Sequence, residues 1–92
     1  MTGPVRLSAQ IHGHVQGVCF RAFVSENATA LGLRGFAGNM ADGSVSVEAE
    51  GERASLEKLV IALQSGPRHA RVDRVDTSWH KATGEFRGFV IL

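Results

Sequence analysis

The sequence contains little that supports disulfide, metal or redox chemistry. It has one cysteine, Cys19, in 92 residues, which excludes an internal disulfide and any Cys-x-x-Cys metal or redox pair. Its 10 lysines and arginines are balanced by 9 aspartates and glutamates, which excludes the broad basic surface of a non-specific nucleic-acid binder. No apolar run approaches the roughly 20 residues that a membrane span requires. Any chemistry must therefore come from a few placed residues.

The length and the first residues set further expectations. Residues 1–4 resemble neither a signal peptide nor a transit peptide, so we expect a reducing, cytoplasmic location. A chain of 92 residues is long enough for one domain with a hydrophobic core. We therefore expect a single domain over residues 1–92 with a flexible segment at 1–4. We also expect a monomer with no membrane or nucleic-acid partner.

The first third of the chain shows a strand followed by a helix. Apolar and polar residues alternate from Val5 to His12, which is typical of a strand with one buried face. The alternation stops over 13–19, where two glycines indicate a loop. From Phe20 to Leu31 the apolar residues are spaced as in an amphipathic helix, and Gly32 is a suitable residue to end it.

The remaining elements follow from the same two periodicities. They are strands over 34–40 and 44–50, a helix around 56–63 that ends at Gly66-Pro67, and strands over 72–80 and 86–92. Asp42-Gly43 predicts a two-residue hairpin, and we expect the last two strands to turn near Thr83-Gly84. The step from Val72 to Val75 breaks the alternation, which predicts a bulge or a late strand start.

The order β-α-β-β-α-β, with a short extra C-terminal strand, predicts an α+β fold. It is the ferredoxin-like split β-α-β sandwich, in which an antiparallel sheet carries two helices on one face. In such a sheet we expect the first and third strands at the centre, with the second beside the third. Glu48 and Glu50 alternate with inward-facing residues, so we expect both at a solvated edge rather than as an acid/base pair.

The loop before the first helix carries the strongest chemical signal. A helix begins with about four unpaired backbone N–H groups, which Ser, Thr, Asp or Asn normally cap. None of these residues occurs between His12 and Arg21, and the first acidic residue of the chain is Glu26. An uncapped helix start with an arginine in its first turn suits an anion, above all phosphate. The alternative is that water caps the helix and Arg21 extends into solvent.

Asn39 is a second candidate, near the end of the second predicted strand. Its carboxamide can accept a hydrogen bond from water and donate one to a phosphate oxygen. The alternative is a turn residue that bonds its own backbone, which asparagine often does. The sequence does not determine its distance from the 13–21 loop.

Four blocks of the sequence resemble the acylphosphatase family. The run Gly13-His14-Val15-Gln16-Gly17-Val18-Cys19-Phe20-Arg21 is similar to the phosphate-loop signature of that family. The second block consists of Leu31-Gly32-Leu33-Arg34-Gly35-Phe36 together with Asn39…Asp42-Gly43-Ser44-Val45, and the third and fourth are Gly66-Pro67…Ala70…Val72 and Gly84…Phe86. It covers Val5 to Leu92 at compatible spacing.

The resemblance implies hydrolysis of acyl phosphates to a carboxylate and inorganic phosphate, with no metal and no cofactor. It places the catalytic arginine at Arg21 and the water-orienting asparagine at Asn39. The backbone N–H groups that would hold the substrate phosphate, with inorganic phosphate or sulfate as competitive ligands, belong to Val15, Gln16, Gly17, Val18, Cys19 and Phe20. One departure is Ala37-Gly38, where the family often has valine and a basic residue; this leaves rate and affinity open.

Two rival functions remain. The Ala37-Gly38 departure motivates a domain of the same fold that binds phosphate or acyl phosphates without turnover. An RNA-binding module of this fold is disfavoured by the near-neutral charge and by the absence of aromatic residues from the 44–50 strand. We expect His14 to be an exposed loop side chain and Cys19 to contribute only its backbone. The other histidines lack metal-ligand spacing.

Overall fold

The computed structural model describes residues 3–92, so residues 1 and 2 of the expected flexible segment lie outside the described residues. Gly3 and Pro4 are exposed and belong to no strand. The elements are β1 (Val5–His14), α1 (Phe20–Ala30), β2 (Arg34–Asn39), β3 (Val45–Gly51), α2 (Arg53–Ser65), β4 (Arg71–Lys81) and β5 (Phe89–Ile91). Within residues 3–92, neither helix has the length and apolarity that crossing a membrane demands.

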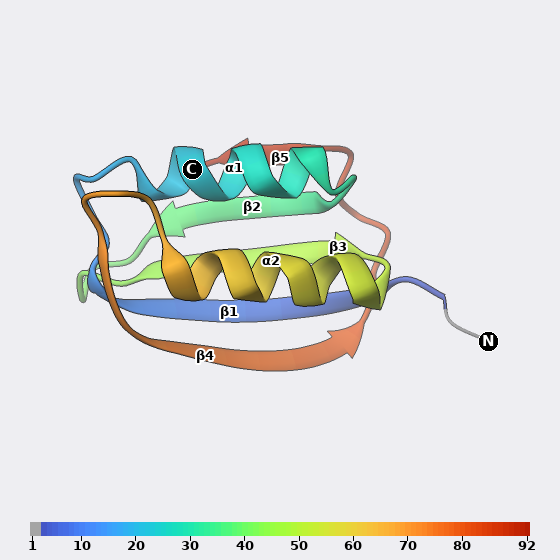
Figure 1. Cartoon of the computed structure of the whole chain (residues 1–92). Helices are drawn as coiled ribbons and strands as arrows, with labels where there is room; N and C mark the ends of the chain where they lie inside the picture. Colours follow the sequence, from blue (N-terminus) through green and yellow to red (C-terminus); the bar gives the residue numbers. More distant parts are fainter. Residues whose placement is uncertain (1–2) are drawn as a thin grey trace.

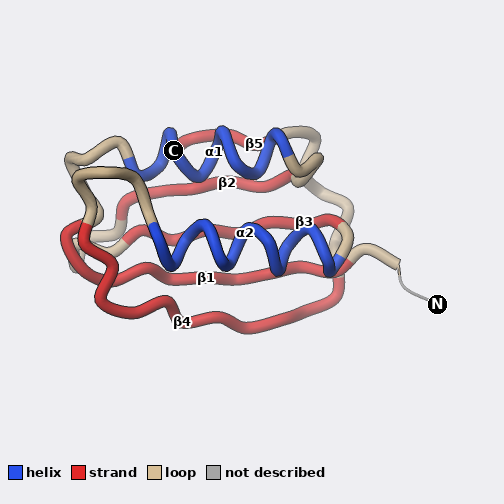
Figure 2. Tube along the Cα trace, viewed as in Figure 1, coloured by secondary structure: helices blue, strands red, loops and turns tan. Residues whose placement is uncertain are grey.

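The strands form one sheet in the order β4-β1-β3-β2-β5, and both helices cover the same face of it (Figure 1). The expected central position of β1 and β3, and the place of β2 beside β3, are confirmed. The prediction of an antiparallel sheet holds for β1 to β4 but is wrong for β5, which pairs with β2 in parallel. After β4 the chain does not turn back at Thr83-Gly84 but crosses to the opposite edge of the sheet (Figure 2).

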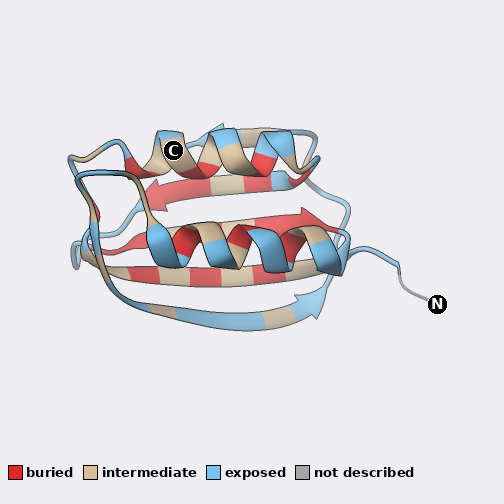
Figure 3. Ribbon diagram, in the orientation of Figure 1, coloured by how far each residue is buried: buried red, intermediate tan, exposed pale blue. Residues whose placement is uncertain are grey.

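The core lies between the sheet and the two helices (Figure 3). Alternate residues of β1 and β3 face it, and α2 contributes residues spaced three and four apart, as the periodicities predicted. Burial of each large apolar side chain stabilises the fold by about 1.5–3 kcal/mol. The largest apolar side chains that are fully buried are Phe20, Leu7, Ile11, Leu56, Leu59 and Leu63.

Glu50 was predicted to face solvent, and this is wrong. Its residue is 1 % exposed, because β3 is an interior strand and the segment after β4 covers this end of its open face. The carboxylate accepts hydrogen bonds from the Thr83 N–H (2.8 Å), the Thr83 hydroxyl (2.9 Å) and the Gly84 N–H (2.9 Å). Glu50 therefore anchors the crossing segment to the sheet.

Of two local predictions about the strands, the bulge and the hairpin turn, one is confirmed and the other is wrong. The bulge is confirmed: the pairing between β1 and β4 shifts between His12 and Gly13, which leaves Asp73 as the extra residue. The two-residue hairpin is wrong, because three residues separate Met40 from Ser44. Met40 N–H donates to the Ser44 carbonyl at 2.8 Å, and Gly43 adopts φ 93°. A glycine of positive φ is what closes a three-residue hairpin loop.

Candidate active site

The site begins where β1 leads into α1. Cys19 occupies the N-cap with φ 62° and ψ 27°, and its side chain makes no capping hydrogen bond. The first turn of α1 holds no acidic residue, so the predicted uncapped helix start is confirmed. Backbone N–H groups at such an end carry partial positive charge toward an anion.

The loop is held at both ends by burial. Val15 and Phe20 are each 1 % exposed and belong to the core, while Val18 packs against it partly buried. Between these anchors, Gly17 takes φ 75° and Cys19 is the one non-glycine residue of 3–92 with positive φ. The left-handed conformation is costly for a side-chain-bearing residue, so the surrounding packing holds this backbone path in place.

A cleft of about 410 Å³ opens beside this loop. It brings Arg21 and Asn39 together, which the sequence did not determine. Of the described residues that line it, only Arg21 carries a formal charge. The lining residues are Val15, Gly17, Cys19, Phe20, Arg21, Ala22, Asn39 and Ile91. Gln16 and Val18, which were also predicted to hold phosphate through their N–H groups, are not among them.

Arg21 is half-buried and its Nη1 donates a hydrogen bond to the main-chain oxygen of Leu92. Leu92 is itself placed by β5, since its N–H donates to the Ala37 carbonyl at 2.9 Å. The C-terminal segment therefore orients the guanidinium. The alternative, in which Arg21 extends freely into solvent, does not describe this structure. Ile91 and Leu92 were not predicted as site residues, because the pairing of β5 with β2 is long-range and leaves no local signal.

Asn39 is the last residue of β2, and it alternates with the buried Ala37, so it faces the helix side of the sheet. Within residues 3–92 its exposed carboxamide makes no hydrogen bond to protein, so it does not bond its own backbone as a turn residue would. Asp42 does so instead: its Oδ1 accepts from the hydroxyl (2.6 Å) and the N–H (3.0 Å) of Ser44. These two bonds hold the pKa of the Asp42 carboxyl below its ordinary value.

Ala37 and Gly38, where the sequence departs from the family pattern, lie next to the C-terminal segment. Ala37 is fully buried. A Cβ at position 38 would lie 3.4 Å from the Leu92 Cβ, so Gly38 is in contact with the residue that orients Arg21.

His14 and Cys19 are both exposed. Within residues 3–92, no three His, Cys, Asp or Glu side chains are grouped so that they could hold a metal ion.

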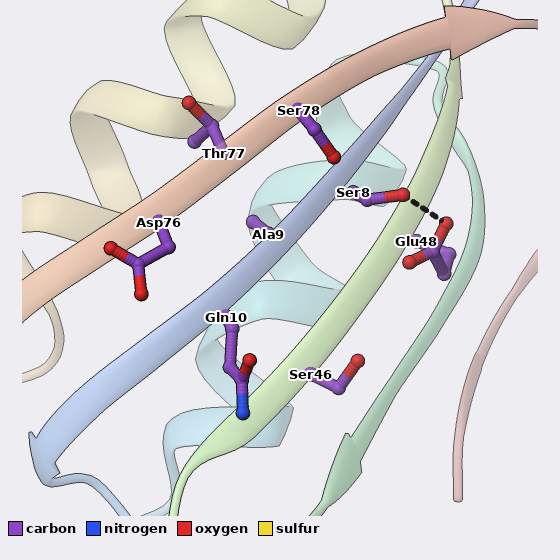
Figure 4. Close-up of a pocket in the computed structure, with 8 residues that line it drawn as sticks. All are labelled: Ser8, Ala9, Gln10, Ser46, Glu48, Asp76, Thr77 and Ser78. Carbon is purple, nitrogen blue, oxygen red and sulfur yellow. Dashed lines mark hydrogen bonds between the residues drawn. The ribbon is translucent and has the colours of Figure 1, made fainter.

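A second concavity, of about 340 Å³, lies on the face of the sheet that the helices leave open (Figure 4). Its lining residues are Ser8, Ala9, Gln10, Ser46, Glu48, Asp76, Thr77 and Ser78. The Glu48 carboxylate there accepts from the Ser8 hydroxyl at 2.7 Å and from Arg6 Nε at 2.8 Å. None of the predicted site residues lines it, so the cleft beside the 15–19 loop is the candidate active site.

Comparisons of the sequence and of the structure with known proteins find the same family. A sequence model of the family described as Acylphosphatase matches residues 7–91. A protein named Acylphosphatase from Deinococcus radiodurans is 50% identical over 80 residues, which cover 87% of this chain and 92% of the relative. One from Roseiflexus sp. (strain RS-1) is 46% identical over 92 residues, covering 100% of this chain and 99% of the relative. The crystal structure of acylphosphatase from Bacillus subtilis superposes with a TM-score of 0.92 at 30% identity, over 96% of this chain and 98% of that one.

Proposed function

The chain belongs to the acylphosphatase family, and we propose that it hydrolyses acyl phosphates to a carboxylate and inorganic phosphate in the cleft beside the 15–19 loop. The observation that supports this most is the meeting of three groups in one cleft: an uncapped helix start, Arg21 and the carboxamide of Asn39, which has no hydrogen-bond partner within residues 3–92. An anionic substrate would satisfy all three at once.

The substrate phosphate would be held by backbone N–H groups of Val15 to Phe20 and by the guanidinium of Arg21. These donors are fixed before the substrate arrives, so they stabilise charge without reorganising. Arginine has five N–H donors in a planar fork. The bond from Nη1 to Leu92 uses one of them, and the others remain available for phosphate oxygens.

Asn39 would orient the attacking water. Its carboxamide oxygen can accept a hydrogen bond from that water while its amino group donates to a phosphate oxygen. Phosphoryl transfer passes through a loose transition state with charge spread over three equatorial oxygens. Placing one water in line with the leaving oxygen is therefore chiefly a positioning effect.

This chemistry requires few groups from the protein. The leaving carboxylate is stable as an anion, so no strong general acid is needed. The proton of the water can pass to the substrate phosphate or leave late in the reaction, so no protein base is needed. Arg21 and the backbone dipoles would supply the positive charge, and we propose that neither a metal nor a cofactor takes part. Inorganic phosphate or sulfate would compete for the same donors.

We also propose that the protein acts as a monomer in the cytoplasm. The support for the location is the exposed free thiol of Cys19 beside the cleft. A reducing compartment keeps such a thiol from oxidising.

Hydrolysis of benzoyl phosphate tests the proposal. We expect the wild-type protein to release phosphate, and Arg21→Lys to lose at least about 100-fold in kcat/KM, because a lysine lacks the fork that binds two oxygens. Inhibition by inorganic phosphate should weaken in the same variant. Arg34→Lys is the matched control, since Arg34 lies at the other end of β2 from Asn39. Wild-type protein that binds phosphate but releases none above background would instead be the non-catalytic binding domain.

A further inference from the structure

The two halves of the proposed site come from different parts of the chain. The 15–19 loop follows β1, whereas Asn39 ends β2 and is followed at once by the hairpin of residues 40–44. Figure 1 shows both connections at the same end of the sheet. Catalysis by positioning requires that the phosphate held by the loop and the water held by Asn39 keep a fixed geometry. A direct link between loop and hairpin would supply that.

The side chain of Gln16 makes this link. Its Nε2 donates to the Met40 carbonyl at 2.8 Å and to the Ser44 carbonyl at 2.9 Å. Met40 and Ser44 are the two residues that close the hairpin, through the Met40 N–H to Ser44 carbonyl bond of 2.8 Å. Within residues 3–92 these are the only side-chain hydrogen bonds that join the loop to the hairpin.

We propose that Gln16 is a positioning residue, which holds Asn39 in register with the phosphate loop. The inference rests on the proposed function and adds to the earlier expectation, which used only the backbone N–H of Gln16. A carboxamide offers two N–H donors without charge, and here both are directed at carbonyl oxygens. A glutamate of the same shape would place a carboxylate oxygen against those two oxygens. The chemistry of the link therefore specifies glutamine rather than a residue of similar size.

The bonds of Gln16 should matter more for the orientation of water by Asn39 than for phosphate binding by the loop. The loop is anchored independently by the buried side chains of Val15 and Phe20, and Arg21 is oriented by Leu92. Phosphate binding should therefore survive the loss of Gln16. The hairpin has no other side-chain tie to the loop within residues 3–92, so the water held by Asn39 should be displaced. A displacement near 1 Å lowers the rate by about 100-fold.

The test is a double-mutant cycle on benzoyl phosphate hydrolysis. We expect Gln16→Ala and the isosteric Gln16→Glu to lower kcat by about 10- to 100-fold, while in Gln16→Ala, which adds no charge beside the loop, the inhibition constant of inorganic phosphate changes by less than about 3-fold. In an Asn39→Ala background the Gln16→Ala change should lower kcat by less than about 2-fold, because the group that it positions is already gone. Gln64→Glu is the matched control, since Gln64 is exposed on α2.

Three results would overturn the inference. They are a wild-type kcat in both Gln16 variants, an equal loss of kcat on Gln16→Ala in the wild-type and Asn39→Ala backgrounds, or a rise in KM and in the phosphate inhibition constant with kcat unchanged. Hydrogen exchange of the side-chain amide in the wild-type protein provides a measurement that needs no variant. The Gln16 amide should exchange more slowly than that of Gln64, and equal rates would show that the link is absent in solution. Inactive wild-type protein would contradict the proposed function instead.

Discussion

The strongest stability prediction concerns Glu50, the buried carboxylate that anchors the segment between β4 and β5. We expect Glu50→Ala to lower the free energy of unfolding by about 3 kcal/mol. The three hydrogen bonds from Thr83 and Gly84 contribute about 1 kcal/mol each, because both residues are exposed and their donors regain water when the carboxylate is removed. In a domain of this size that loss lowers Tm by roughly 12–24 °C.

The pH dependence of the same group gives a second measurement. Burial raises the pKa of the Glu50 carboxyl, but the Thr83 and Gly84 N–H groups, the Thr83 hydroxyl and the charge of Arg6 together hold it below its ordinary value of 4.5. A carboxyl with a lowered folded-state pKa stabilises the protein above its unfolded-state pKa, and the contribution is lost as the pH falls through the folded-state value. The stability difference between wild type and Glu50→Gln should therefore be largest near pH 7 and shrink below about pH 4.5.

Urea unfolding followed by the fluorescence of Trp79, the single tryptophan, measures both effects at pH 7 and at pH 3.5. Glu57→Ala is the matched control, because its exposed carboxylate pairs only with Arg53 among the described residues, at 3.4 Å, and should change stability by less than about 0.5 kcal/mol. Equal stabilities of the Glu50 and Glu57 variants at pH 7, or a Glu50→Gln effect that does not vary with pH, would refute the reasoning.

The remaining predictions concern the site. Asn39→Ala should lower kcat by at least about 100-fold and change KM by less than about 3-fold; a rise in KM alone would make Asn39 a binding residue. Cys19→Gly should stabilise the protein by about 0.5–1 kcal/mol in urea unfolding, because glycine relieves the left-handed conformation at φ 62°, and it should keep kcat within about 3-fold; a larger loss would show that the thiol takes part. EDTA should leave the benzoyl phosphate rate unchanged, and a loss restored by added divalent metal would contradict hydrolysis without a metal.

Most of the fold could be predicted because its signals are local. Alternation in β1 and helical spacing in α2 each appear within one segment, and the order of elements then restricts the topology. The errors occurred where long-range pairing decides. β5 has three residues, too few for its periodicity to indicate a partner. Glu50 alternates as an outward residue should, yet a segment more than 30 positions later in the chain covers it.

The candidate site also has features that the sequence predicts locally and features that depend on long-range contacts. The absence of a capping residue between His12 and Arg21 is visible in the sequence, and the structure has the uncapped start that it predicts. The contribution of Leu92 was not predictable, because it depends on the parallel pairing of β5 with β2. The bonds of the Gln16 side chain to Met40 and Ser44 were missed for a related reason. Their acceptors are backbone carbonyls, which no sequence pattern identifies.

The proposed site is assembled chiefly from main-chain groups, which would let a nearly neutral protein bind a highly charged substrate. The proposed phosphate donors are N–H groups, Arg21 donates to a main-chain oxygen of Leu92, and Gln16 donates to two backbone carbonyls. Dipoles of this kind are fixed by the path of the chain, so they add no net charge and need no counter-ion when the site is empty. The side chain of the exposed Cys19 can then vary at little cost, whereas the positive φ angles at Gly17 and Cys19 cannot. What the sequence must specify here is a backbone shape, and Arg21 and Asn39 are the two side chains to which the proposed mechanism assigns phosphate binding and the orientation of water.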